Sequence, residues 1–201
     1  MKLKYMLAAG VILLSGTMCE QADADGGSMA YKTWSLPNTA NIKRYRRAAE
    51  QGSAPAQFYV SMMYTFGYGV QKNHAEAVKW LLKAAEQDLA QAQNNLGGMY
   101  NSGLGVPPDY AEAVKWFRKA ARQGDVAAQK NLAAKYSNGQ GVPQNYAEAY
   151  VWSSIAVLSG NERAIHNRDF AATQLSTEDL VTARIRAANL YEEIQQRKEG
   201  E

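Results

Sequence analysis

A period of 36 residues governs the middle of this 201-residue chain. A fixed period between about 20 and 50 residues is typical of arrays in which each unit packs on its neighbours. The recurring positions are Trp80, Trp116 and Trp152; Gly67, Gly103 and Gly139; Gly69, Gly105 and Gly141; Tyr64, Tyr100 and Tyr136; and Ala56, Ala92 and Ala128. The chain is therefore predicted to fold as a repeat array.

Each unit is predicted to contain two amphipathic helices. In one unit, apolar or small residues fall at helical spacing over residues 92–100 and again over residues 113–121. A Gly-Xaa-Gly-Val segment lies between the two stretches, and glycine there can adopt positive φ and reverse the chain. The result is a helix–turn–helix unit repeated along the sequence.

The second helix of each unit has start and stop signals that also recur. Asn or Asp stands three residues before Glu, the spacing of an N-cap with a reciprocal acidic partner. The helix then ends at a residue suited to the left-handed conformation, Gly or in one unit Asp. The start pairs are Asn73 with Glu76, Asp109 with Glu112 and Asn145 with Glu148, and the stop positions are Gly52, Asp88, Gly124 and Gly160.

The pattern Ala-…-Leu-Gly-x-Met-Tyr-x-x-Gly-x-Gly-Val-…-Ala-Glu-Ala-x-x-Trp-…-Ala-Ala resembles the Sel-one-like repeat family, a branch of the tetratricopeptide-like α-solenoids. The resemblance implies an all-α fold, a right-handed α-solenoid of antiparallel helix pairs, with full repeats at 53–88, 89–124 and 125–160. It also implies a protein-interaction scaffold, often exported in bacteria, with no cofactor.

The ends of the array differ from its middle, because terminal units must cover the exposed apolar face of the last repeat. Residues 41–52 match the second helix of a unit, with Arg44 in place of the tryptophan, and are predicted to form a degenerate half-repeat. Residues 161–201 are predicted to form C-terminal capping helices, the last of them over 176–197.

The first 24 residues are predicted to be a signal peptide, since two lysines precede an apolar run that is too short to span a bilayer comfortably. Cleavage after Ala24 would leave a mature chain that begins at Asp25, with a linker over 25–40. The alternative is a lipoprotein anchored through Cys19, which the bulky Met18 disfavours. We therefore expect a periplasmic or secreted protein without an integral membrane segment after cleavage.

The sequence offers little for catalysis or metal binding. Its only histidines are His74 and His166, and neither has a partner at metal-ligand spacing. The nucleophile elbow, the phosphate loop, the zinc-protease motif and the Ser-x-x-Lys motif are all missing. A net charge of +3 without a basic reading module gives no reason to expect nucleic acid as a partner. We expect no catalytic residues, no metal site and no cofactor.

The first helices of such arrays line a groove, and side chains that the fold does not need there are free to bind. The candidate binding residues are Phe58, Tyr59, Met62, Asn95 and Asn131. A row of side-chain amides can hold a peptide backbone, because each amide offers donors and an acceptor. The aromatic residues of the first repeat could instead cover the degenerate half-repeat, and the amide row could be ordinary polar surface.

The expected function is a non-catalytic scaffold of the bacterial envelope that binds a protein or peptide. One alternative is a secreted, host-directed interaction factor with the same physics and a different partner. A hydrolase of envelope glycan or lactam is a further alternative, and it would require a cluster of titratable groups that the sequence does not contain.

Overall fold

The computed structural model describes residues 39–199, and within them every regular element is a helix. The predicted signal peptide 1–24 and the predicted linker 25–40, apart from its last two residues, lie outside the described residues. The elements in chain order are α1 (Thr39–Glu50), α2 (Ala54–Phe66), α3 (His74–Glu86), α4 (Ala90–Ser102), α5 (Tyr110–Arg122), α6 (Val126–Asn138), α7 (Tyr146–Leu158), the short 3-10 helix η1 (Glu162–Ala164), α8 (Ile165–Thr173) and α9 (Thr177–Glu199).

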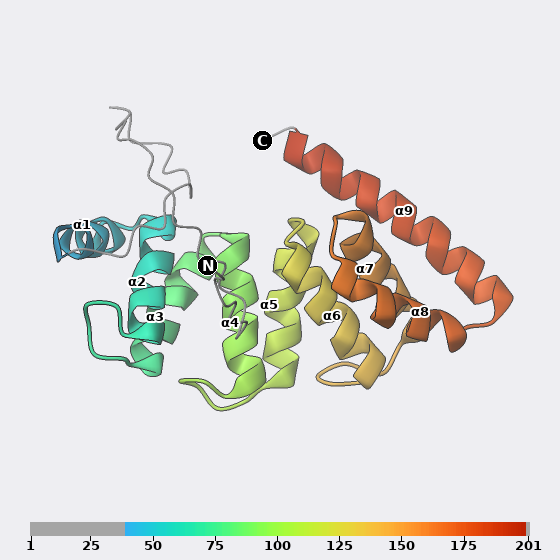
Figure 1. Cartoon of the computed structure of the whole chain (residues 1–201), viewed down its shortest axis with the longest axis horizontal. Helices are drawn as coiled ribbons and strands as arrows, with labels where there is room; N and C mark the ends of the chain where they lie inside the picture. The colour runs from blue at the N-terminus through green and yellow to red at the C-terminus, as the bar shows by residue number, and fades with distance from the viewer. Residues whose placement is uncertain (1–38, 200–201) are drawn as a thin grey trace, which may run out of the picture. The chain divides into compact units, whose positions relative to one another are not determined.

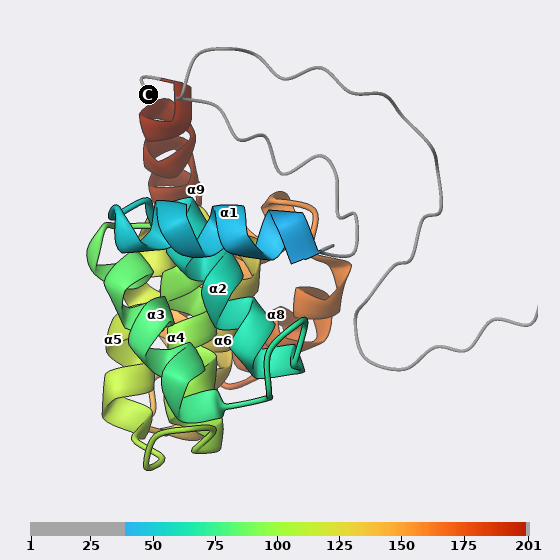
Figure 2. The ribbon, with the colours of Figure 1, turned by 90° about the vertical axis from the view of Figure 1, so that its left-hand side faces the viewer.

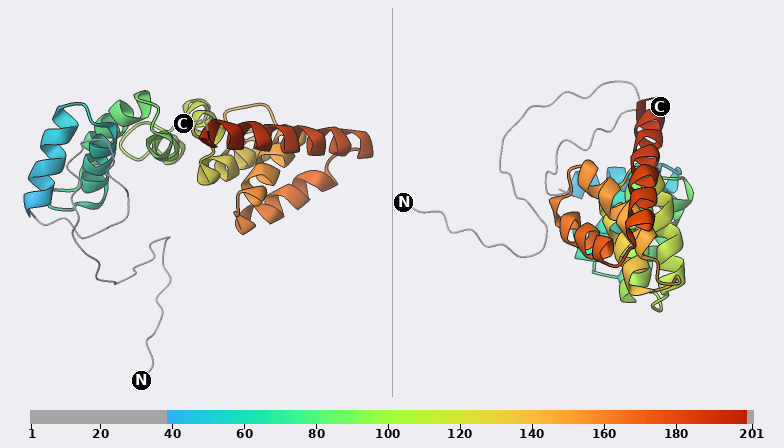
Figure 3. Two further views of the ribbon diagram at one scale, coloured as in Figure 1. Left: turned by 90° about the horizontal axis from the view of Figure 1, so that it is seen from above. Right: turned by 90° about the vertical axis from the view of Figure 1, so that its right-hand side faces the viewer.

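Consecutive helices pack on one another, so the pairs α2–α3, α4–α5 and α6–α7 follow in chain order (Figure 1). At the N-terminal end α1 packs on α2, across which it lies in Figure 2. At the other end α8 and the long α9 pack on α7 (Figure 3). This arrangement confirms the predicted all-α solenoid of helix pairs.

The predicted helix starts and stops are present in the backbone. The Glu76 amide N–H donates to Asn73 Oδ1 at 3.1 Å, and the equivalent bonds recur at α5 and α7. Asp88 adopts φ 61° at the end of α3, where the other units use glycine. The reciprocal half of the predicted capping motif is absent at α3, because the Asn73 backbone amide donates to the Tyr64 carbonyl at 2.9 Å and the Glu76 carboxylate pairs with Lys79 at 2.6 Å.

The second glycine of each turn is a contact between repeats as well as a bend. Gly141 has φ 78°, and a Cβ there would collide with the backbone carbonyl of Tyr110, the first residue of α5. A Cβ at Gly105 would likewise collide with the backbone of His74 at the start of α3. The turns of the second and third repeats therefore press on the preceding unit at a point where only hydrogen fits.

Buried glutamines also join neighbouring repeats. Gln93 Nε2 donates to the carbonyl of Ala85 in the preceding helix at 3.0 Å, and Gln93 Oε1 accepts from Gln123 Nε2 at 2.8 Å. The first repeat makes the same two bonds through its own glutamine pair. In the third repeat, Ser159 occupies the position of the donor glutamine. The buried Oε1 of Gln129 therefore has no partner among the described residues.

Large aromatic residues at equivalent repeat positions are expected to pack one unit on the next, but the tryptophan row is not uniformly buried. Trp116 and Trp152 are 8% and 4% exposed and belong to the core. Trp80 is only half-buried, with the Lys83 ammonium 4.5 Å from the centre of its ring. Trp80 packs with the small N-terminal cluster around Ile42, so fewer side chains cover it.

Candidate functional site

The predicted binding residues lie along one face formed by α2, α4 and α6. Two contacts between helices make this face continuous: Asn95 Nδ2 lies 3.6 Å from Met62 Sδ, and Asn131 Nδ2 donates to Asn94 Oδ1 at 3.2 Å. All of these side chains are half-buried. We call Tyr59, Met62, Asn94, Asn95 and Asn131 the first-helix face.

The aromatic end of this face also contacts α1. The ring of Tyr59 lies 4.9 Å from that of Tyr45 in α1, with an interplanar angle of 36°. Phe58 is half-buried and packs against the core cluster that contains Leu96. Only the Tyr59–Tyr45 contact is one that the covering role requires, because Phe58 packs toward the next repeat, and Met62 and the asparagines lie further along the array.

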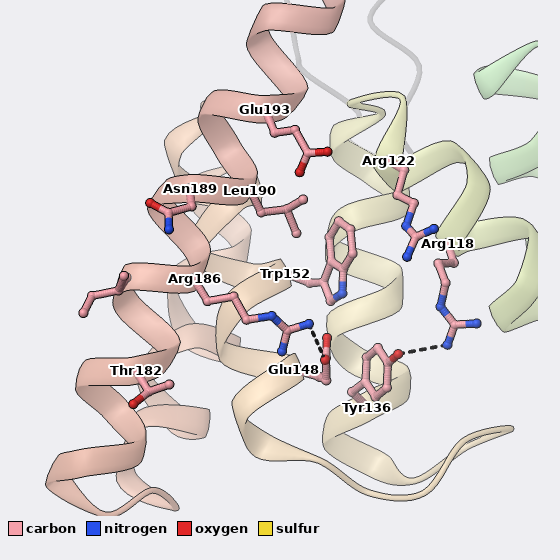
Figure 4. A pocket seen from close by; sticks show the side chains of 11 residues that line it. Arg118, Arg122, Tyr136, Glu148, Trp152, Thr182, Arg186, Asn189, Leu190 and Glu193 are labelled. Carbon is pink, nitrogen blue, oxygen red and sulfur yellow. Dashed lines mark hydrogen bonds and ion pairs between the residues drawn. The ribbon is translucent and has the colours of Figure 1, made fainter.

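A concave surface lies between α5, α7 and α9, beside Tyr136 of α6, with a volume of about 540 Å³ (Figure 4). Arg118 and Arg122 project from α5 on one side, and Trp152 of α7 lies between them and α9. Leu190 and Glu193 project from α9 on the other side. We call this surface the arginine groove.

Polar contacts hold α9 in place as the far wall of the arginine groove. Arg186 of α9 pairs with Glu148 of α7 at 2.6 Å. The equivalent Glu112 pairs instead with Lys115 of its own helix, but the third repeat has Val151 at the lysine position. The last turn of α9 is tied down where Lys198 Nζ donates to the Gly124 carbonyl at 3.1 Å.

The sequence did not predict the arginine groove, because α9 lies outside the repeat and its direction is not set by the period. Two signals were available. Arg122 occupies the position of Glu50 and Glu86 in the preceding units, a reversal of charge that the repeat does not need. Glu148 was the second, because Val151 replaces the lysine that pairs with the equivalent glutamate in the other repeats.

The histidines and acidic side chains are the groups to consider for metal binding. Within residues 39–199, no group of three His, Cys, Asp or Glu side chains could hold a metal ion. His74 is half-buried at the start of α3, whereas His166 in α8 is exposed. In the same range no helix is both long enough and apolar enough to cross a membrane.

Burial changes the pKa of two groups in the third repeat. It lowers the pKa of the Lys135 ammonium, which donates to Gln140 Oε1 at 2.8 Å and lies 4.5 Å from the ring centre of Tyr110. Burial also raises the pKa of Asp125, the N-cap of α6, although its bond from the Ala128 amide opposes that change. Lys135 stands where the other repeats have Met63 and Met99.

The helix pairs and their 36-residue period define the class of protein, an α-solenoid of the tetratricopeptide-like kind. The Sel1 repeat model matches residues 45–53, 54–89, 90–125 and 126–161, which is more than half of the chain. The chain therefore belongs to the Sel1 repeat family. Proteins of this family are generally non-catalytic, protein-interaction scaffolds.

The solved structures that are similar to this chain include the following two. A Sel1 repeat protein from Oxalobacter formigenes is 36% identical with a TM-score of 0.60, and the match covers 64% of this chain and 97% of that one. A protective antigen present in uropathogenic Escherichia coli strains, displaying an SLR fold, is 29% identical with a TM-score of 0.59. That match covers 77% of this chain and 41% of the antigen, so this chain spans well under half of it. No curated protein matches the chain.

Proposed function

We propose that this chain is a non-catalytic scaffold of the bacterial envelope that binds a protein or peptide along the first-helix face. The observation that carries the proposal is the continuity of that face across three repeats, through the Met62–Asn95 and Asn94–Asn131 contacts. Each asparagine amide offers two donors and an acceptor, and these two bonds use only part of that capacity. The remaining groups suit an extended peptide backbone.

The test of this proposal compares a double variant on the face with a single control variant remote from it. Asn95→Ala combined with Asn131→Ala removes two amides from the face, while Gln196→Ala removes an exposed amide of α9, which lies outside the face. Proteins captured from an envelope fraction are identified by mass spectrometry, and the affinity of each is then measured by titration calorimetry. We expect the double variant to weaken binding about tenfold or more, and Gln196→Ala to leave it unchanged. Equal binding by all three proteins would remove the first-helix face from the proposal.

Tyr59 is tested separately because its ring also contacts Tyr45. Tyr59→Ala is expected to lower the free energy of unfolding by about 1 kcal/mol or more through loss of the aromatic pair. A binding role in addition predicts a loss of affinity per folded molecule, which a titration corrected for the folded fraction measures. Loss of affinity at an unchanged melting temperature would mean that Tyr59 binds the partner and does not cover α1.

The envelope location rests on the N-terminal sequence, which lies outside the described residues. Export with cleavage after Ala24 predicts that the intact mass of the native protein corresponds to a chain beginning at Asp25. A diacylated species beginning at Cys19 would replace the soluble form with a lipoprotein. Fractionation decides between the periplasm and the medium, and recovery in the medium would favour a host-directed factor.

A further inference from the structure

The charge at position 122 departs from the repeat. The preceding units have Glu50 and Glu86 at this point, in the last turn of the second helix. Repeat folding therefore tolerates a carboxylate here and does not require a cation. Arg122 is exposed, and no other described side chain forms an ion pair or hydrogen bond with it.

The neighbouring charges of the arginine groove are already matched. Arg186 is neutralised by Glu148, and Glu193 pairs with Arg197. Arg118 donates to the hydroxyl of Tyr136 at 2.9 Å, which is a neutral partner. The α5 wall thus carries two guanidinium groups that have no carboxylate partner among the described residues.

The rest of the groove is suited to an apolar side chain. Trp152 closes it from beneath and is 4% exposed, while Ile185 on the α9 wall is 58% exposed. Leu190 lines the same wall and is half-buried. A ligand that covers this exposed isoleucine gains binding free energy, because burial of apolar surface is favourable by roughly 25 cal/mol per Å².

We propose that the arginine groove binds an acidic peptide segment, with its carboxylates on Arg122 and Arg118 and an adjacent apolar side chain between Trp152 and Ile185. Guanidinium groups form paired hydrogen bonds with carboxylates, and such contacts are stronger than neutral ones. This surface is formed by α5, α7 and α9 with Tyr136 of α6, and it shares no residue with the first-helix face, so it is a different site. The chain thereby has two binding surfaces of different chemistry.

The experiment uses a library of random 12-residue peptides displayed on phage, selected on the chain purified from an expressing bacterium. The most enriched peptide is then synthesised with a fluorescent label, and its Kd is measured by polarisation at two salt concentrations. The central variant is Arg122→Glu, which restores the residue of the preceding units and is therefore expected to fold. Arg163→Glu is the matched control, since it makes the same charge change at an exposed position in η1.

We expect the selected peptides to be rich in Asp and Glu beside an apolar residue. Arg122→Glu should raise Kd by about 10- to 100-fold, because it removes charge-assisted bonds and adds a repulsive charge. Arg163→Glu and Asn95→Ala should change Kd less than about twofold, in line with surface changes remote from a site. Higher salt should weaken binding, since the contact is ionic.

Three results would overturn the inference. The first is a selection without enrichment of acidic residues, and the second is equal Kd for Arg122→Glu and the unaltered chain. The third is an equal loss of affinity in Arg163→Glu, which would mean that the effect depends only on the net charge of the protein. Peptides that depend on Asn95 and not on Arg122 would support the proposed function while excluding the arginine groove.

Discussion

The turn of the third repeat offers a sharp test of how the repeats are joined. Gly141 and Gly160 both have positive φ, 78° and 89°. A Cβ at Gly160 would meet nothing within 4 Å, whereas a Cβ at Gly141 would collide with the Tyr110 carbonyl in the preceding unit. Replacing each glycine by alanine therefore separates the cost of the backbone conformation from the cost of the contact.

Gly160→Ala should cost about 1–2 kcal/mol, the price of placing an L-residue in the left-handed region. Gly141→Ala incurs the same conformational cost and must also displace the turn from the start of α5. The obstructing atoms belong to the backbone and cannot rotate away, so overpacking adds about 1–3 kcal/mol. The expected total for Gly141→Ala is about 2–5 kcal/mol.

The assay is urea unfolding followed by far-ultraviolet circular dichroism, with the slope of the transition compared as well as its midpoint. A constant slope shows that the two variants unfold from the same native state, which permits their free energies to be compared. A Gly141→Ala variant no less stable than Gly160→Ala would refute the reasoning. The turn would then be a bend only, and the repeats would be joined by their helices alone.

Three further predictions concern stability. Ser159→Gln should raise the free energy of unfolding by about 1 kcal/mol by donating to the unpartnered Oε1 of Gln129, and no gain in urea melts would contradict this. Lys135→Met should stabilise the protein at pH 7 by about 0.5–2 kcal/mol, since methionine is the repeat residue there. Because burial lowers the pKa of Lys135, the unfolded state binds more protons, so the unaltered protein should gain stability as pH rises toward 10.5. Melts across that pH range should show that the Lys135→Met variant lacks the gain in stability that comes from Lys135. Trp152→Ala should cost about 3–5 kcal/mol, and Trp80→Ala about half as much because it is only half-buried; equal losses would count against that difference in burial.

The sequence determined the features that repeat. The turn glycines, the Asn73, Asp109 and Asn145 caps and the left-handed Asp88 are each required by local backbone geometry. Such local requirements select the same residue types at the same position of each repeat, and the sequence pattern of the family contains the same residue types. The helix pairs and their order could therefore be predicted without coordinates.

Burial at the ends of the array was less predictable. Trp80 occupies the same repeat position as Trp116, yet only the latter is buried, because the unit before Trp80 is a single helix. The hydrogen bonds of the buried glutamines were also missed, since Gln57 and Gln93 look like surface residues until their donors are placed beside them. Repeat position fixes which way a side chain points, but neighbours decide how much of it is covered.

The two candidate sites also differ in how far the sequence predicts them. The period placed Asn95 and Asn131 on equivalent faces of successive first helices, and their contacts with Met62 and Asn94 follow from that stacking. The arginine groove depends on the direction of α9, which no period specifies. The direction of α9 is set by contacts between residues far apart in the sequence, such as Arg186 of α9 with Glu148 of α7. Because α9 is not part of the repeat, the period does not predict these contacts. Only the tertiary structure could therefore place a wall opposite Arg122.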